Sequence, residues 1–207
     1  MIFKKENSQN KFIKITSKKN INFEKKIFGF WLYLMSECIV FSVLFVVFFL
    51  MNTKNQCFNM MKTHEISFQI IFLETIFLLL SSFIYSIIVY FFKRISIRNI
   101  FFILCLTLFF TSLFLILEIY ELNHIFLVFC PYEINGFFSS FFALLGMHCI
   151  HIFGAIFWIL LLIFRIFFNE NIKNLYSDFF CLNLFFQFLD IIWLFIIIFV
   201  YLLHKIS

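Results

Sequence analysis

Residues 137–165 read FFSSFFALLGMHCIHIFGAIFWILLLIFR, an apolar stretch in which the only Asp, Glu, Lys or Arg residue is Arg165 at the end. About 20 apolar residues are enough for a helix to cross the hydrocarbon core of a bilayer. The stretch also contains two histidines, His148 and His151, three positions apart. It therefore predicts a membrane-spanning helix that carries polar groups near its middle.

Four more segments have the same character, and the composition of the whole chain agrees with them. Of the 207 residues, 64% are hydrophobic and 13% are charged, whereas about a quarter are charged in an average soluble domain. With one proline, four glycines and no alternation of apolar and polar residues, the chain fits helices better than a barrel. We expect an all-α membrane protein, a bundle of five transmembrane helices over 28–51, 66–92, 99–118, 137–165 and 179–203.

The distribution of lysine and arginine predicts how this bundle is oriented. Thirteen Lys and Arg residues lie on the side of the N-terminus and three lie on the other side, and positively charged loops stay in the cytoplasm. We therefore expect the N-terminus inside and the C-terminus outside. No internal repeat or second domain is visible, so residues 28–207 are expected to form one domain after a basic cytoplasmic tail, 1–27.

The tail itself does not resemble a secretory signal, since it has no continuous apolar stretch and no small-residue cleavage site. Its eight lysines are expected to orient the first span and to contact anionic lipid. Nucleic-acid binding is not expected, because the tail lacks a folded platform that could make specific contacts.

The six cysteines are scattered and show no CxxC spacing for zinc or redox chemistry. We interpret them as small apolar residues that fill space. A disulfide between Cys57 and Cys130 stays open as an alternative, because both fall in loops predicted to lie on the same side of the membrane.

Four polar side chains are expected near the middle of the bilayer. With a rise of about 1.5 Å per residue, Glu37, Glu74, His148 and Asp190 lie roughly 12 to 16 Å from the nearest ends of their spans. Charged groups at this depth are costly and are usually paired or functional. We expect hydrogen bonds between helices at one level, with each carboxyl either protonated or held by a donor; a proton relay through the carboxyls is the alternative.

The histidine pair admits a structural and a metal-binding interpretation. His148, His151 and Gly154 are expected on one helix face, where the glycine would let a neighbouring helix approach closely. The other histidines, His64, His124 and His204, lie in or near the outer connectors and terminus, and no HExxH pattern is present. We therefore expect interhelical hydrogen bonding, with no catalytic residue, metal ligand or cofactor in this chain.

The third span ends in LEIYELNH, which places Glu118 and Glu121 on one helix face near the expected outer surface. We interpret these acids as an interfacial cap. Trp31 and the aromatic residues at the span ends are expected to anchor the helices at the membrane interface.

Five sequence stretches, one on each span, resemble those of a known family in the same order. They are KIFGFWLYLMSECIVFSVLF, LETIFLLLSS, LEIYELNH, GFFSSFFALLGMHCIHIFGAIFW and CLNLFFQFLDIIWLFIIIFVYLL. In these stretches the chain resembles subunit III of the haem-copper oxidases, and within that family it is most similar to the cytochrome o ubiquinol oxidase branch. The five-span length also fits that branch, because the cytochrome c oxidase subunit has two further spans at its start.

The resemblance implies a non-catalytic subunit of a proton-pumping terminal oxidase in the bacterial inner membrane. In such a complex ubiquinol is oxidised and oxygen is reduced to water, and haem and copper belong to subunit I, against which this chain would pack. The family also holds phospholipid between its helices. Glu37 falls where the family carries an intramembrane carboxylate that reacts with carbodiimides in cytochrome c oxidases. His148 and His151 match the family's paired histidines, and Glu118 and Glu121 match its outer ExYE motif.

One position departs from the family pattern. The last span of the family usually reads WHFxDxxW, whereas this chain reads FQFLDIIW, with Gln187 for the histidine and with Asp190 and Trp193 retained. A glutamine can still donate and accept hydrogen bonds, so packing is expected to survive the change, whereas a proton-linked role for this position is not expected.

Three other functions stay open at this level. A subunit III of a cytochrome c oxidase would share most of the motifs, and a stand-alone membrane cytochrome or carrier would bind haem itself. A transporter would need discontinuous helices and repeats around a midplane site, and the sequence has neither signal.

Overall fold

The computed structural model describes the backbone of residues 2–52, 68–92, 94, 96–129, 136–168 and 172–202. Every element in these ranges is helical: α1 (Ile2–Asn52), α3 (Phe68–Phe91), α4 (Ile97–Phe129), α5 (Gly136–Phe167), α6 (Ile172–Ile196) and a π-helical end, η1 (Ile197–Leu202). Five of these helices are long and apolar enough to cross a membrane. The predicted all-α fold with five spans is confirmed.

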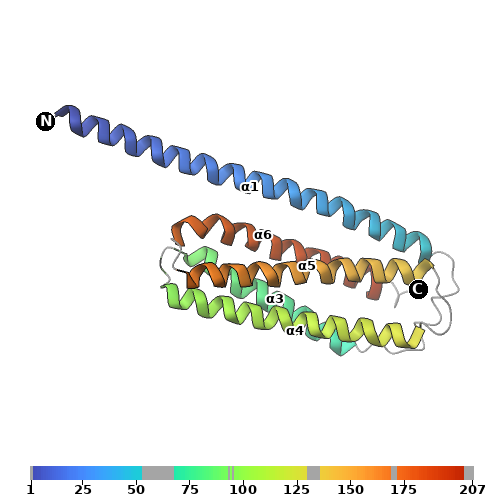
Figure 1. The fold of residues 1–207 in the computed structure, drawn as a ribbon. Coiled ribbons are helices and arrows are strands. Elements are labelled where there is room, and N and C mark those ends of the chain that lie inside the picture. Colours follow the sequence, from blue (N-terminus) through green and yellow to red (C-terminus); the bar gives the residue numbers. More distant parts are fainter. Residues whose placement is uncertain are drawn as a thin grey trace.

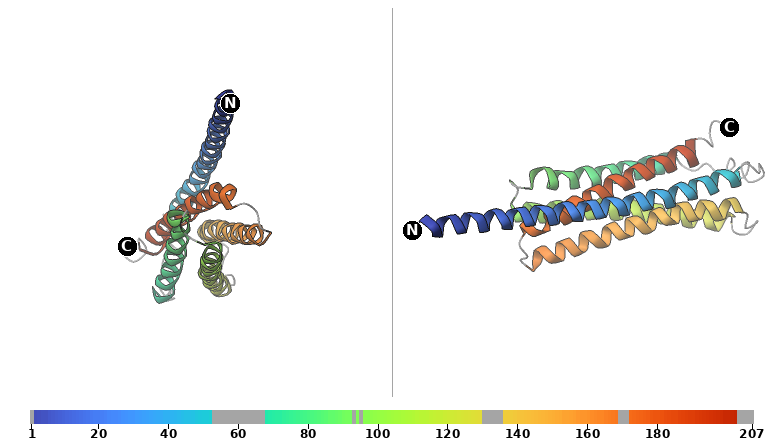
Figure 2. Two further views of the ribbon diagram at one scale, coloured as in Figure 1. Left: turned by 90° about the vertical axis from the view of Figure 1, so that its left-hand side faces the viewer. Right: turned by 90° about the horizontal axis from the view of Figure 1, so that it is seen from above.

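The helices run alternately up and down, so that α1 begins at one end of the bundle and α6 ends at the other (Figure 1). Helices α3, α4, α5 and α6 pack in a ring, each against its two neighbours. Helix α1 lies outside this ring against α5 and α6 (Figure 2). Its N-terminal part extends beyond the bundle as one continuous helix, so no break in the backbone separates the basic tail from the first span.

The connection between α3 and α4 is short, and backbone hydrogen bonds form at both helix ends. The amide of Arg94 donates to the carbonyl of Phe91 at 2.8 Å, and the amides of Asn99 and Ile100 donate to the carbonyl of Ser96 at 3.0 and 3.1 Å. Serine is a favourable residue at the start of a helix. The tight connection makes α3 and α4 antiparallel neighbours.

Large apolar side chains fill the space between the helices, with Tyr85, Leu144, Phe186 and Ile159 fully buried among them. Helix α6 is the central element. In its most apolar 18-residue stretch 44% of the residues are buried inside the protein, compared with 17% in that of α1. The outward faces are also apolar, as expected where side chains meet lipid or another subunit rather than water.

The third span is longer than predicted. Helix α4 runs to Phe129, and the part of it that is apolar enough to span a membrane reaches Leu127. The sequence predicted that this span ends at residue 118. The acids that were taken to mark the membrane surface instead turn toward the interior of the bundle, and the helix therefore continues past them. The predicted loops that contain Cys57, Cys130, His64 and His204 lie outside the described residues.

Candidate functional site

Polar side chains join the helices in pairs, and each pair links different helices. Four of these side chains, Glu37, Glu74, His148 and Asp190, are the ones expected near the middle of the bilayer. Each of them faces a separate neighbour: Glu37 faces His151, Glu74 faces Glu121, His148 faces Trp193 and Asp190 faces Ser82. Among the described residues, the contact of Glu37 with His151 is a hydrogen bond between helices, whereas the Glu74 carboxyl, the His148 ring nitrogens and Oδ1 of Asp190 have no hydrogen-bond partner. Hydrogen bonding at one level of the membrane stays a prediction.

The contact between Glu37 on α1 and His151 on α5 is the best defined of these contacts. The Nε2 atom of His151 lies 3.1 Å from Oε2 of Glu37, and the side chains are 8% and 18% exposed. On its other side, Nδ1 of His151 lies 2.7 Å from the carbonyl oxygen of Met147. Phe41 packs against the imidazole with a centroid distance of 5.2 Å. The ring is therefore held at both nitrogens.

This arrangement limits where protons can sit. A carbonyl oxygen only accepts hydrogen bonds, so Nδ1 of His151 must carry a hydrogen and donate to Met147. Between Nε2 and the Glu37 carboxyl there is then room for one further proton, which belongs either to the acid or to the ring. In both forms the pair has zero net charge, and a neutral pair is what the interior of a membrane favours.

His148 has a different environment although it is only three residues away. Its ring is fully buried and stacks on the indole of Trp193 with a centroid distance of 5.3 Å and an interplanar angle of 20°. Phe114 closes the edge of both rings. Among the described residues neither ring nitrogen of His148 has a hydrogen-bond partner. His148 therefore contributes through packing in this structure, and not through the hydrogen bonding that was predicted.

The indole of Trp193 links this aromatic cluster to α3. Its Nε1 atom donates to the hydroxyl oxygen of Thr75 at 3.3 Å. The two histidines thus belong to different interfaces: His151 faces α1, and His148 faces α4 and α6. Their angular separation of about 60°, from three residues at 3.6 per turn, is enough to produce this division.

The predicted role of Gly154 is wrong. The residue is exposed, and a Cβ atom placed on it would meet no atom within 4 Å. Among the described residues of this chain, no helix approaches closely there. The contact between α5 and α1 is instead made by the larger side chains of Glu37, Phe41 and His151.

The acids of the ExYE motif lie in the bundle and do not cap its surface. Glu118 is 2% exposed, and it lies beside the thiol of Cys149 on α5. Glu121 faces the fully buried Glu74 of α3. Both ExYE acids also line a small gap, together with Trp193. Their predicted location on one face of the helix agrees with this shared gap, whereas their predicted interfacial location stays a prediction.

An ion-pair cluster that the sequence did not predict ties together one end of the bundle. Asp178 on α6 bonds to Lys26 on α1 through Oδ1 and to Arg165 on α5 through Oδ2, the latter at 2.6 Å. The carboxyl side chain is only 10% exposed, whereas the two cations are 52% and 40% exposed. The sequence could have indicated this cluster, because Lys26, Arg165 and Asp178 all lie at the same predicted end of the spans.

The remaining predicted residues, Gln187 and Asp190, lie on α6 beside α3. Asp190 is partly buried next to Ser82, and Gln187 is exposed on the outward side. One turn away, the hydroxyl of Ser86 donates to the side-chain oxygen of Asn183 at 2.9 Å. Polar side chains of α3 and α6 therefore meet at two points, Ser86 with Asn183 and Ser82 with Asp190.

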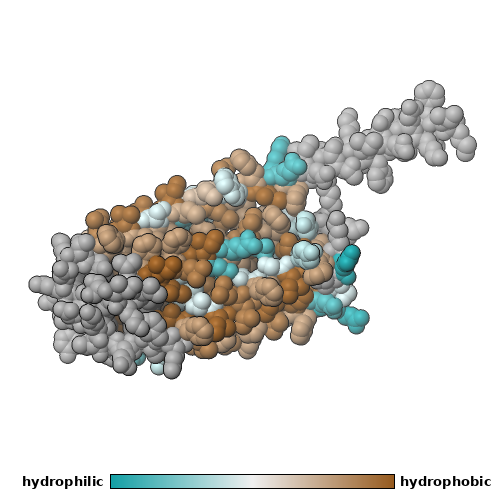
Figure 3. Space-filling view, turned by 180° about the vertical axis from the view of Figure 1, so that it is seen from behind, coloured by the Kyte–Doolittle hydropathy of each residue, from teal (hydrophilic) through white to brown (hydrophobic). Residues whose placement is uncertain are grey.

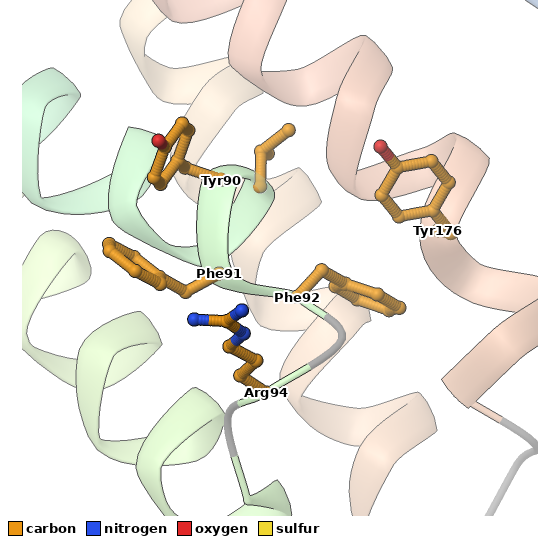
Figure 4. A pocket seen from close by; sticks show the side chains of 6 residues that line it. Tyr90, Phe91, Phe92, Arg94 and Tyr176 are labelled. Carbon is orange, nitrogen blue, oxygen red and sulfur yellow. The ribbon is translucent and has the colours of Figure 1, made fainter.

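An open pocket lies where α3 ends. Its volume is about 460 Å³, and it is lined by Val89, Tyr90, Phe91, Phe92, Arg94 and Tyr176. Figure 4 shows the guanidinium of Arg94 beside the ring of Phe91, with Tyr176 facing them across the pocket. Arg94 is the cation among the lining residues that the structure describes, and a cation among aromatic rings is suited to an anionic headgroup.

Comparison with known proteins gives a consistent result. No family model matches the chain. It is 40% identical to the cytochrome bo(3) ubiquinol oxidase subunit 3 of Buchnera aphidicola subsp. Baizongia pistaciae, over 87% of this chain and 92% of that protein. It is 32% identical to the protein of the same name from Pseudomonas putida, over 86% and 85%, and 32% identical to quinol oxidase subunit 3 of Bacillus subtilis, over 86% of each chain.

Proposed function

Because the chain belongs to the subunit 3 family of the quinol oxidases, we propose that it is the accessory subunit of a proton-pumping ubiquinol oxidase that packs against subunit I. The similarity over most of both chains carries this proposal. In such an oxidase the oxidation of ubiquinol and the reduction of oxygen take place at the haem and copper of subunit I. The present chain takes part as a membrane-embedded support in the bacterial inner membrane.

The polar contacts support a role in packing rather than in redox chemistry. His151 is occupied at both nitrogens by Met147 and Glu37, and His148 is enclosed by Trp193 and Phe114. Both nitrogens of His151 are engaged and the ring of His148 is fully buried, so neither imidazole can reach a haem iron unless these contacts are broken. We therefore infer that His148 and His151 are not haem ligands.

Bound phospholipid is a second element of the proposal. The pocket at the end of α3 combines Arg94 with Tyr90 and Tyr176 at its rim. It opens at the end of the bundle where the basic residues gather, so an anionic headgroup would find a positive charge there. We infer that a phospholipid occupies this pocket in the assembled oxidase.

Copurification tests the function. An affinity tag on this chain is expected to recover a large haem-bearing membrane protein from a mild detergent extract of native membranes, together with phospholipid identified by mass spectrometry. The chain expressed alone is expected to show no haem absorption. Repeated absence of the haem-bearing partner from an intact extract would contradict the proposal, and a haem spectrum from the chain alone would favour a cytochrome.

A further inference from the structure

We propose that the polar region between α3 and α6 is a docking surface for a transmembrane helix of another oxidase subunit, one that presents hydrogen-bond donors at the middle of the membrane. The region, here called the α3–α6 polar stripe, consists of Ser82, Ser86, Asn183, Gln187 and Asp190. This inference rests on the proposed function, since it names the face on which the complex is built.

The depth of the stripe is the first part of the argument. The apolar stretch long enough to span the membrane in α6 and the start of η1 runs from Leu175 to Phe199. Gln187 lies at the midpoint of this stretch, about 18 Å along the helix from either end. Ser82 lies close to the midpoint of the corresponding stretch of α3, Ile70–Phe91. The stripe is therefore at the level where neither water nor lipid headgroups are available to form hydrogen bonds.

The second part is that these polar groups are not satisfied within the chain. Gln187 is exposed, and no hydrogen bond joins its amide to another residue that the structure describes. The Oδ1 atom of Asp190 is buried and likewise has no partner in the described part of the chain. Ser86 and Asn183 bond to each other. The amide of Gln187 is thus left unpaired on the outward side, and Oδ1 of Asp190 is left unpaired inside the chain. An unpaired polar group is unfavourable in hydrocarbon.

The surroundings show that this region differs from the other outward faces. Figure 3 shows hydrophilic residues gathered in the middle of the face on which α3 and α6 lie, with hydrophobic residues around them. Phe83, Leu79 and Leu194, at 69%, 44% and 45% exposure, are apolar residues that the two helices also present outward. Polar groups in the centre with an apolar rim are typical of a contact between membrane helices.

Polar residues elsewhere in the spans provide a contrast. Ser42 on α1 is exposed, but its hydroxyl donates to the carbonyl of Cys38 in its own helix at 2.5 Å. Ser112 on α4 donates to the carbonyl of Phe109 in the same way. Such residues can face lipid at little cost because their donors are used. Gln187 has no comparable hydrogen bond within the described part of the chain.

The chemistry of the occupant follows from these groups. Acyl chains cannot donate a hydrogen bond, so lipid tails do not satisfy the stripe. Oδ1 of Asp190 is buried inside the chain and is not reached from outside, whereas the exposed amide of Gln187 can both donate and accept. A partner helix with a hydroxyl, amide, indole or cationic side chain at mid-depth would pair with Gln187, and the other subunits of the oxidase are the proteins available to supply it.

Site-specific photocrosslinking in the intact oxidase tests the surface. A benzophenone amino acid would replace Phe83 beside the stripe, and Phe153 on α5, a phenylalanine of similar exposure at 63%, would be the matched control position. We expect light to join position 83 to another subunit several-fold more often than position 153. Equal crosslinking at the two positions, or crosslinks from position 83 only to lipid or to a second copy of this chain, would overturn the inference.

A substitution gives an independent measurement. Gln187→Leu makes α6 more apolar, so the amount of chain in the membrane should not fall. We expect the fraction that stays with the oxidase in detergent to decrease about five-fold, as the loss of one interhelical hydrogen bond implies. Ser42→Ala, which removes a hydroxyl satisfied within its own helix, is the control and should leave this fraction unchanged.

The two proposals fail in different ways. If the wild-type chain itself does not stay with an oxidase, the proposed function is wrong. If the wild-type chain stays with the oxidase and Gln187→Leu stays equally well, the function stands and the docking surface is wrong.

Discussion

At the scale of single residues, the contact between Glu37 and His151 is the polar interaction that the structure defines most completely. The carbonyl of Met147 fixes the donor role of Nδ1, so the hydrogen bond between Nε2 and the Glu37 carboxyl requires a proton on one of these two groups. The contact joins α1 to α5 across 114 positions of sequence. It is therefore expected to contribute to stability whether or not it takes part in proton movement.

Two substitutions at Glu37 separate these roles. Glu37→Leu leaves Nε2 of His151 without a partner, and we expect it to lower the free energy of unfolding by about 1 to 3 kcal/mol. The measurement is the melting temperature of this chain in the purified oxidase. Glu37→Gln keeps a group that can donate to Nε2, so assembly and melting temperature should be close to those of the wild type.

The same pair of variants tests the alternative of a proton relay. Glutamine cannot exchange a proton as the carboxyl does. If Glu37→Gln assembles normally but the oxidase no longer pumps protons, the structural interpretation of Glu37 is wrong and the relay interpretation gains support.

At the scale of helices, the sequence predicted the elements well and their contacts only in part. The apolar segments are long enough to determine each span, because helix formation satisfies the backbone in lipid. The end of α4 was predicted eleven residues early because Glu118 was assumed to face headgroups, whereas it is buried beside Cys149. The partner of a buried acid depends on how the helices rotate against each other, and sequence spacing does not give that rotation.

Helix packing at the charged end of the bundle depends on Asp178, which joins α6 to α1 and α5. Asp178→Asn removes both ion pairs with Lys26 and Arg165. Because the two cations are half exposed, we expect a modest loss of about 1 kcal/mol. The loss should be largest at low ionic strength, since salt screens the wild-type interaction.

Thermal unfolding of the purified oxidase at low and high salt measures this effect. Lys26→Gln is the matched control and should cost less, because Arg165 still pairs with Asp178. A melting temperature of Asp178→Asn equal to that of the wild type at low salt would argue against a stabilising role for the cluster.

At the scale of the whole molecule, the ring of α3, α4, α5 and α6 supports α1 on one side and presents the α3–α6 polar stripe on another (Figures 1 and 2). The five spans and the family could both be predicted from the sequence, because each depends on patterns within a segment. The separation of His148 from His151 and the open position of Gly154 could not, since both depend on which helices lie next to α5.

Membrane orientation is a property of the whole chain that the excess of Lys and Arg predicts. We expect a green fluorescent protein fused to the N-terminus to fluoresce, because that end stays in the cytoplasm. Alkaline phosphatase fused to the C-terminus should be active, because this enzyme matures only outside the cytoplasm. A fluorescent C-terminal fusion together with an inactive phosphatase would reverse the predicted topology.

The pairing of Glu37 with His151 also has a consequence for biosynthesis. The two residues are separated by 114 positions, and at roughly 5 to 20 residues per second the ribosome needs about 6 to 25 s to make the intervening chain. During that interval Glu37 is already in the membrane, whereas His151 has not yet been synthesised. The nascent protein therefore carries an uncompensated carboxyl group until the fourth span arrives, and insertion factors or proteases that survey the membrane have that time in which to bind it.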